Sequence, residues 1–429
     1  MARLYKIPGP RSRRLGAELS GVESPNVTFM GPPGPIFWRR ARGHEVWDVD
    51  GNRYVDFTSA FGVASLGHNP NAVRRAIRGQ SRELIHGMGD VHPTEAKVQL
   101  LSKLSELTFE RWTKGAVRAQ SVLCNSGFES VEVALKTALL ATGRSRIVAF
   151  AGAYHGLGYG SLQVTWHQMF RAPFSSQLRR LTHFLPYPRK ADELESVAAQ
   201  LRMELRGGEI GAVVVEPAQA RAGHVFPPNG FLKRLRAECD RLGTLLVCDE
   251  IFTGFWRTGV PFAVEREQVV PDLICLGKAL SGTLPISACV GTPQVMSAWP
   301  RSEGEAIHTS TFLGNPLACA AALASIAEWR DPAWRSHLAC SERALREALD
   351  RELARCPRVR EIRGRGLMFG VELTDRSAPS VCQRLLERGF ILLPAGEGDV
   401  LALSPPFKTP HADFRKFARA LREVLCERA

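Results

Sequence analysis

The stretch TLLVCDEIFTGFWRTG, residues 244–259, decides how the rest of the chain is interpreted. Residues 244–249 are mostly apolar and indicate a strand that is buried on both faces. This strand ends on two consecutive acids, Asp249 and Glu250. A carboxylate is costly to bury unless a positive charge pairs with it. We therefore expect a cation at the end of this strand.

Other short apolar segments have the same character, and amphipathic helical patterns lie between many of them. This alternation predicts an α/β fold in which helices cover both faces of a mainly parallel sheet, over roughly residues 65–310. The expected strands are 121–124, 146–150, 210–216, 244–249, 272–277 and 286–291, and the expected helices include 129–142, 191–205 and 230–243.

The two ends of the chain follow a different pattern. Residues 34–57 indicate short strands that turn at Asp50-Gly51-Asn52. The C-terminal part indicates a strand after a Gly-rich turn in 363–373, and then an amphipathic helix. We predict a smaller α+β domain assembled from both ends of the chain. The expected segments are 1–64 for its N-terminal part, 65–315 for the large cofactor-binding domain and 316–429 for its C-terminal part.

Composition limits the function classes. The chain has 429 residues and a net charge of +13, but its 56 Lys and Arg are spread without interleaved aromatic residues, which argues against a nucleic-acid groove. No apolar run reaches the ~18 residues of a membrane span. The ten cysteines form no C-x-x-C pair. This pattern argues against a metal site or a disulfide framework and favours reduced thiols in a cytoplasmic protein.

Four groups are predicted to meet at the carboxyl edge of the sheet. Lys278 follows strand 272–277 in an apolar setting, which lowers the pKa of a lysine and frees its amine as a nucleophile. The helix start at 125–129 offers N–H groups and a positive dipole to a phosphate. Tyr154 can stack on a flat ligand. Together with Asp249 they suggest pyridoxal 5′-phosphate, whose ring nitrogen would supply the expected cation.

These residues belong to a long, ordered set of motifs: NSGFES (125–130), YHG (154–156), VVVEPAQA (213–220), CDEIFTGFWRTG (248–259), LGKALSGTLPISACVG (276–291) and HTSTFLGNPLACAAA (308–322). With them the sequence resembles the class III pyridoxal-phosphate-dependent aminotransferases of fold type I. That family includes ornithine and 4-aminobutyrate aminotransferases and glutamate-1-semialdehyde aminomutase. The resemblance extends over nearly the whole chain and implies the same fold.

The resemblance also implies a role for each matching residue. Lys278 would form the Schiff base with the cofactor and carry a proton between the substrate α-carbon and the cofactor. Asp249 would pair with the ring nitrogen. Ile251 would pack on one face of the ring and Tyr154 on the other, while Gln219 would approach the ring hydroxyl. Lys278 and Asp249 are therefore the expected catalytic residues.

The phosphate and the substrate have their own implied residues. Backbone amides around Ser126, Gly127 and Phe128 would bind the phosphate. Thr311 resembles the threonine that reaches the phosphate of the neighbouring subunit, which implies a homodimer with shared active sites. Glu216 lies where the family has an acid near the substrate. The partners implied are a small-molecule amine donor and an oxo acceptor.

Three positions depart from the commonest family members. Phe128 replaces a small hydroxyl residue of the phosphate site, and Leu157 and Ala402 replace two arginines that bind substrate carboxylates. We therefore expect a substrate whose carboxylate is absent, remote or held by another cation. The candidates for that cation are Arg171, Lys408 and Arg257.

The predicted activity is transfer of an amino group from an amine or ω-amino donor to a 2-oxo acid or aldehyde. The alternative is an aminomutase similar to glutamate-1-semialdehyde 2,1-aminomutase. A nicotinamide enzyme would need a G-x-G-x-x-G motif after the first strand and an acid about 20 residues further on, and the sequence has neither in a suitable place. A non-catalytic protein would have no reason to keep a buried lysine.

Overall fold

The computed structural model describes residues 4–28 and 34–427. The chain folds into two compact units, one formed by Met1–Pro70 with Pro332–Ala429 and the other by Asn71–Asp331. We call the first the small unit and the second the large unit. These bounds differ from the predicted limits at 64 and 316, and the assignment of functional domains stays a prediction.

A seven-stranded sheet of order β4-β10-β9-β8-β7-β5-β6 forms the centre of the large unit. Neighbouring strands are parallel, except that β10 is antiparallel to both β4 and β9. The predicted α/β fold with a mainly parallel sheet is thus confirmed. The strands are β4 (Gln120–Cys124), β5 (Arg146–Phe150), β6 (Thr182–Leu185), β7 (Ile210–Val215), β8 (Leu245–Asp249), β9 (Leu273–Leu276) and β10 (Ser287–Gly291).

The edge strand β6 is absent from the predicted strands. It has only four residues, THFL, and three of them are only partly buried. An edge strand pairs on one side only and needs no long apolar run. The pattern that identifies the buried strands of this sheet therefore does not identify β6.

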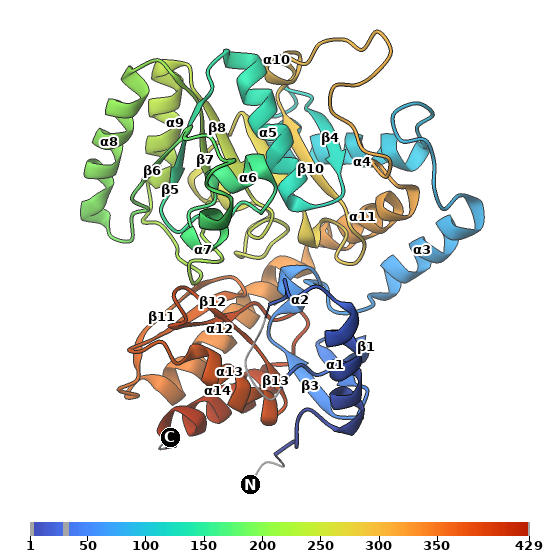
Figure 1. The fold of residues 1–429 in the computed structure, drawn as a ribbon, viewed down its shortest axis with the longest axis vertical. Helices are drawn as coiled ribbons and strands as arrows, with labels where there is room; N and C mark the ends of the chain where they lie inside the picture. Colours follow the sequence, from blue (N-terminus) through green and yellow to red (C-terminus); the bar gives the residue numbers. More distant parts are fainter. Residues whose placement is uncertain (1–3, 29–33, 428–429) are drawn as a thin grey trace. The chain divides into compact units, whose positions relative to one another are not determined.

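Helices cover the sheet, as Figure 1 shows for α5 (Gly127–Thr142), which contacts β4, β10 and β9. α8 (Leu194–Arg206) and α9 (Phe231–Leu242) pack side by side. α5 ends at Gly143 with φ 65° and α9 at Gly243 with φ 60°, the left-handed conformation in which glycine commonly ends a helix. These three helices were predicted from their amphipathic patterns.

α11 (Pro316–Trp329) belongs to the large unit, where it packs against α3 (Asn71–Glu83) and α4 (Glu95–Ser105). Its sequence is apolar on most sides, so it is buried by both neighbours, whereas the sequence analysis placed it in the C-terminal segment. The remaining helical segments of this unit are η1 (Glu106–Glu110), α6 (Tyr159–Val164), α7 (Gln168–Arg171), η2 (Ala172–Phe174), η3 (Ala191–Glu193), η4 (Ala263–Glu267), η5 (Lys278–Leu280) and α10 (Pro293–Met296).

The small unit combines both ends of the chain in two four-stranded sheets, β1-β2-β3-β13 and β11-β12-β15-β14. β13 is parallel to β3, so the C-terminal segment completes the N-terminal sheet. Residues 363–365, predicted as a turn, are the end of β11. The elements are α1 (Pro10–Val22), β1 (Trp38–Arg42), β2 (Glu45–Asp48), β3 (Arg53–Asp56), α2 (Ser59–Gly62), α12 (Ala333–Leu353), β11 (Val359–Arg365), β12 (Met368–Leu373), α13 (Ala378–Glu387), β13 (Phe390–Ile391), β14 (Leu393–Ala395), β15 (Val400–Leu403) and α14 (His411–Cys426).

The central strands of the large unit form its buried core. Every residue of β7, β9 and β10 is buried, which is typical of strands covered on both faces. All ten cysteines are free, with Cys340 and Cys426 exposed and the others buried. None of the helices in 4–28 and 34–427 is both long enough and apolar enough to cross a membrane.

Candidate active site

The site lies at one edge of the large unit's sheet. β4, β9, β8, β7 and β5 all end at this edge, because β10 is antiparallel to both of its neighbours. Ligands of open parallel sheets bind at this edge. The first residues after the five strands include Ser126, Tyr154, Glu216 and Lys278, and Asp249 is the last residue of β8.

Asp249 is 5% exposed and has two hydrogen-bond donors. Its Oδ1 accepts from the backbone N–H of Ile251 at 3.0 Å, and its Oδ2 accepts from Nδ1 of His155 at 2.7 Å. Burial alone would lower the pKa of His155, but the hydrogen bond to Asp249 and its negative charge raise it above its ordinary value. The chain itself therefore supplies a hydrogen-bonding partner for the buried acid.

Glu216 is a second buried acid beside this pair, with 6% of its surface exposed. Its Oε1 accepts from the backbone N–H of Tyr154 and its Oε2 from that of Ala220, both at 3.0 Å. Burial raises the pKa of Glu216 to about 7, against the opposing positive charge of His155. Glu216 can therefore hold or release a proton near neutral pH while it connects the segments after β5 and β7.

Lys278 begins η5 with φ 42°, a conformation that is uncommon for a residue with a side chain and is often found at functional sites. Its Nζ lies 5.4 Å from the centre of the Phe252 ring. Burial lowers the pKa of Lys278, although Asp249 and Glu216 raise it in part. A larger share of this amine is therefore neutral, and nucleophilic, than in an exposed lysine.

An anion cradle forms where α5 begins. The carboxylate of Glu129 accepts from the backbone N–H of Asn125 at 2.7 Å and of Ser126 at 3.3 Å. The N–H groups of Gly127 and Phe128 start the helix and have no acceptor within it. The Ser126 hydroxyl is buried and has no hydrogen-bond partner among the described residues. An incoming phosphate would satisfy these donors.

Ile251 lies between the anion cradle and the strand that leads to Lys278. A methyl group built on Gly127 would come within 3.0 Å of the Ile251 side chain, and one built on Gly277 within 3.3 Å. The absence of side chains at both glycines therefore lets Ile251 pack close to the backbone. This position suits a residue that covers one face of a flat ligand.

Tyr154 and Gln219 follow β5 and β7. The Tyr154 ring packs edge-on against Phe170, with ring centres 5.6 Å apart, and burial raises the pKa of its hydroxyl. Gln219 is 2% exposed, and its Nε2 donates to the carbonyl of Ala151 at 2.8 Å. Both predicted residues thus lie on the segments that carry Glu216 and His155.

Phe128 packs over the loop that follows His155. Methyl groups built on Gly156 and Gly158 would lie only 2.3 Å and 2.7 Å from atoms of Phe128. The side chain therefore faces this loop, and only the backbone of Phe128 is available to the cradle. Leu157, in the same loop, is 49% exposed.

Thr311 is exposed in the single chain. The adjacent Ser310 lies at the cradle, because its Oγ accepts from Nδ2 of Asn125 at 2.8 Å. The loop that carries Thr311 is thus fixed beside the start of α5. Its predicted contact with a neighbouring subunit stays a prediction.

Glu250 and the candidate cations have contacts of their own. Glu250 accepts from the backbone N–H of Val264 at 2.8 Å and from the Thr253 hydroxyl, so it stabilises the segment after β8. Arg257 is fully buried, and the Arg171 guanidinium stacks over Phe184 at 5.0 Å. Lys408 is part of the small unit and lies over Trp334 at 5.0 Å.

Two residues that contact the predicted catalytic residues were not predicted. His155 was seen only as a neighbour of Tyr154, and its bond to Asp249 depends on β5 and β8 both flanking β7. Phe252 lies beside Lys278 because the chain turns sharply after β8. The available signals were a histidine a few residues after one strand and an aromatic residue a few residues after another.

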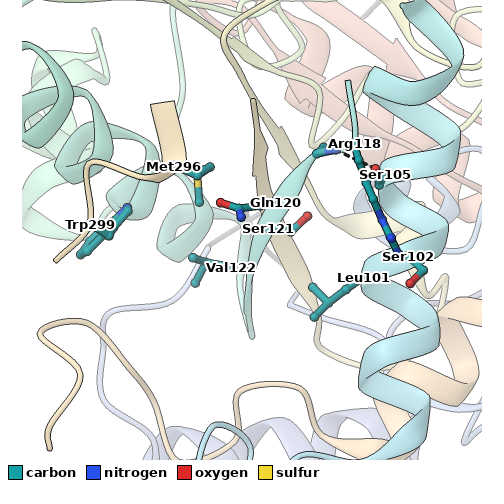
Figure 2. Close-up of a pocket in the computed structure, with 10 residues that line it drawn as sticks. Leu101, Ser102, Ser105, Arg118, Gln120, Ser121, Val122, Met296 and Trp299 are labelled. Carbon is teal, nitrogen blue, oxygen red and sulfur yellow. Dashed lines mark hydrogen bonds between the residues drawn. The ribbon is translucent and has the colours of Figure 1, made fainter. Parts of the chain in front are cut away.

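A cavity of about 450 Å³ lies at the start of β4, whereas the site lies beyond the end of that strand. Figure 2 shows the residues around it, which include Gln120, Leu101 and Trp299. None of the predicted site residues lines this cavity. Within the described residues, no group of three or more His, Cys, Asp or Glu side chains could hold a metal ion.

The donor set fits pyridoxal phosphate. The buried, unpartnered Ser126 hydroxyl and the start of α5 suit its phosphate, and the Lys278 amine can react with its aldehyde. Asp249 can face its ring nitrogen, with His155 fixed behind it.

Comparison with known proteins agrees with this geometry. The aminotransferase class-III family model matches residues 30–425. An acetylornithine aminotransferase of Methanopyrus kandleri is 36% identical, covering 91% of this chain and 94% of its own. A 4-aminobutyrate aminotransferase of Mycobacterium tuberculosis is 35% identical, covering 94% and 92%. The PLP-bound structure of an amine transaminase from an uncultivated Pseudomonas species matches with a TM-score of 0.83 at 26% identity, covering 94% and 98%.

The predicted family, fold and cofactor are confirmed by these relatives. An enzyme with a reactive lysine, a buried acid and an anion cradle at one sheet edge has the groups that amino transfer requires. The chain therefore belongs to the class III aminotransferases and is a pyridoxal-phosphate-dependent transaminase.

Proposed function

We propose that this transaminase moves an amino group from an amine or ω-amino donor to a 2-oxo acid or aldehyde acceptor, with the large unit as the cofactor-binding domain. One observation carries the proposal. The buried amine of Lys278 follows β9, and the buried Asp249, which is hydrogen-bonded to His155, ends the neighbouring strand β8. The names of the relatives support a donor whose amino group is remote from a carboxylate, since they include acetylornithine and 4-aminobutyrate aminotransferases.

When bound, pyridoxal phosphate supplies an aldehyde that takes up the amino group and a ring that withdraws electrons. Lys278 would hold the aldehyde of the cofactor through its Nζ. With a donor bound, the same Nζ would take a proton from the donor carbon and deliver it to the cofactor carbon on the other side of the amino nitrogen. A lowered pKa suits this task, because an amine that takes up a proton must first be neutral.

Asp249 keeps the ring nitrogen protonated. Its Oδ1 is fixed by the Ile251 N–H and its Oδ2 by His155, so the carboxylate cannot rotate away. Glu216, which holds the backbone of Tyr154, keeps the segment after β5 beside this pair. Water is largely excluded here, and this strengthens the charge interaction.

The remaining site residues hold the cofactor. The hydroxyl of Ser126 and the backbone amides of Gly127 and Phe128 bind the phosphate, because they are the unsatisfied donors at the start of α5. Ile251 and Tyr154 would cover the two faces of the cofactor ring. Gln219, on the segment after β7, would hydrogen-bond to the ring hydroxyl.

We also infer a homodimer in which Thr311 reaches the phosphate site of the partner subunit. Exposed apolar side chains support this, because such side chains favour burial against another surface. Some are near Thr311 in the sequence, and the others are on residues 85–91, where Asp90 accepts a hydrogen bond from Thr309. They are Ile85, Met88, Val91, Ile307 and Phe312. The buried, unpaired thiols support a cytoplasmic enzyme.

A half-reaction experiment tests the function. Purified protein is loaded with pyridoxal phosphate, and the absorbance of the cofactor is followed after addition of a donor alone. We expect conversion to the amino form of the cofactor that stops until a 2-oxo acid is added. Lys278→Ala should remove the covalently bound cofactor absorbance and the activity. Continued turnover of a single substrate without any acceptor would instead indicate an aminomutase.

A further inference from the structure

A guanidinium is well suited to bind a substrate carboxylate, and the resemblance implies two arginines for this purpose that the sequence lacks. Leu157 and Ala402 occupy those positions. Two of the candidate cations belong to the large unit: Arg257 is fully buried, and Arg171 stacks on Phe184. A further arginine, Arg221, acts electrostatically on Tyr154 of the site.

Arg221 lies on a tight turn that follows β7. The turn is closed by Gln219 and Val225, whose backbones exchange two hydrogen bonds of 2.9 Å. The N–H of Ala220 donates to Oε2 of Glu216 at 3.0 Å, which fixes the turn to the buried acid of the site. Arg221 is exposed, and within the described residues no hydrogen bond or ion pair holds its guanidinium.

The turn packs against the loop that leads to Tyr154. A methyl group built on Gly152 would come within 3.1 Å of the side chain of Ala222, the residue after Arg221. Burial raises the pKa of Tyr154, and the positive charge of Arg221 opposes this increase. The guanidinium is therefore within electrostatic reach of the phenol that we expect on one face of the cofactor.

The same turn reaches Lys278 through two rings. His224 is 2% exposed, and its ring centre lies 5.4 Å from that of Phe252. The Phe252 ring in turn lies 5.4 Å from Nζ of Lys278. Arg221 is thus carried by a short, well-packed segment between the reactive lysine and Tyr154.

We propose that Arg221 binds the carboxylate of the amino donor or of the 2-oxo acid, and so makes the site select substrates that carry one. The proposal rests on the proposed aminotransferase function. A guanidinium binds a carboxylate through two parallel hydrogen bonds, which fixes the orientation of the substrate as well as its charge. Because Arg221 has no ion pair with any of the residues that the structure describes, it loses none of these when the substrate binds.

The test compares matched donors that differ only in a carboxylate: 4-aminobutyrate with propylamine, and ornithine with 1,4-diaminobutane. We expect Arg221→Gln to lower kcat/KM for the carboxylate donors by roughly 10- to 100-fold, as for the loss of a charged hydrogen bond, and to change the amine donors less than about 2-fold. Arg221→Lys should recover part of the loss. The control is Arg146→Gln, which removes a surface arginine paired with Glu209 at the start of β5.

Calorimetric binding of glutarate to the cofactor-loaded protein provides a second measurement that needs no turnover. We expect Arg221→Gln to weaken glutarate binding by a similar factor. Equal losses for both members of each donor pair would overturn the proposal, as would a carboxylate-specific loss in Arg171→Gln instead. Absence of amino transfer with every donor would refute the proposed function, while glutarate binding would still decide the role of Arg221.

Discussion

Replacement of Glu216 by Gln should change how the stability of the enzyme depends on pH. The carboxyl is 6% exposed, and burial raises its pKa from 4.5 to about 7. The native state therefore binds this proton more tightly than the unfolded state. The resulting stabilisation is fully present below about pH 4.5 and is lost as the pH rises through about 7.

The size of the effect follows from the shift. About 2.5 pH units at 1.36 kcal/mol each amount to about 3 kcal/mol. The large unit, Asn71–Asp331, has about 260 residues, so its unfolding entropy is about 0.55 kcal/mol/K. The unfolding temperature of Glu216→Gln relative to the parent should therefore rise by about 6 °C between pH 4.5 and pH 8.

Scanning calorimetry on protein stripped of pyridoxal phosphate measures this difference across the pH range. Gln keeps an acceptor for the Tyr154 N–H and loses the one for Ala220, which adds an offset of about 1–3 kcal/mol that does not depend on pH. Glu209→Gln, in an exposed ion pair with Arg146, is the control and should show a flat difference. A flat difference for Glu216→Gln as well would refute the reasoning.

Three further changes should have measurable effects. His155→Phe leaves the buried Asp249 with only a backbone donor, so we expect about 3 kcal/mol lower stability in denaturant unfolding, and pyridoxal phosphate should recover more of the stability than in the parent. Ser126→Ala should weaken pyridoxal phosphate binding in fluorescence titrations, without weakening that of pyridoxal, which lacks the phosphate. Gly156→Ala combines φ 110° with a 2.3 Å approach to Phe128 and should lower the unfolding temperature by several degrees, whereas unchanged stability would show that the loop is not tightly packed.

The sequence was sufficient to predict the buried strands of the sheet and the charged residues at their ends. β7, β8 and β9 are continuous apolar runs, and the residues that follow them stand out because charge is rare in such a setting. β6 has no such run, because it is a short edge strand. The bond between His155 and Asp249 was beyond reach, since it depends on strand order in space, which local patterns do not encode.

The distribution of the free thiols has a practical consequence. Cys340 on α12 and Cys426 at the end of α14 are exposed, and both belong to the small unit, while every cysteine of the large unit is buried. A thiol-reactive dye added to the native enzyme should attach to these two helices and leave the large unit unmodified. The small unit can thus carry a fluorescent reporter of its own unfolding without any engineered cysteine.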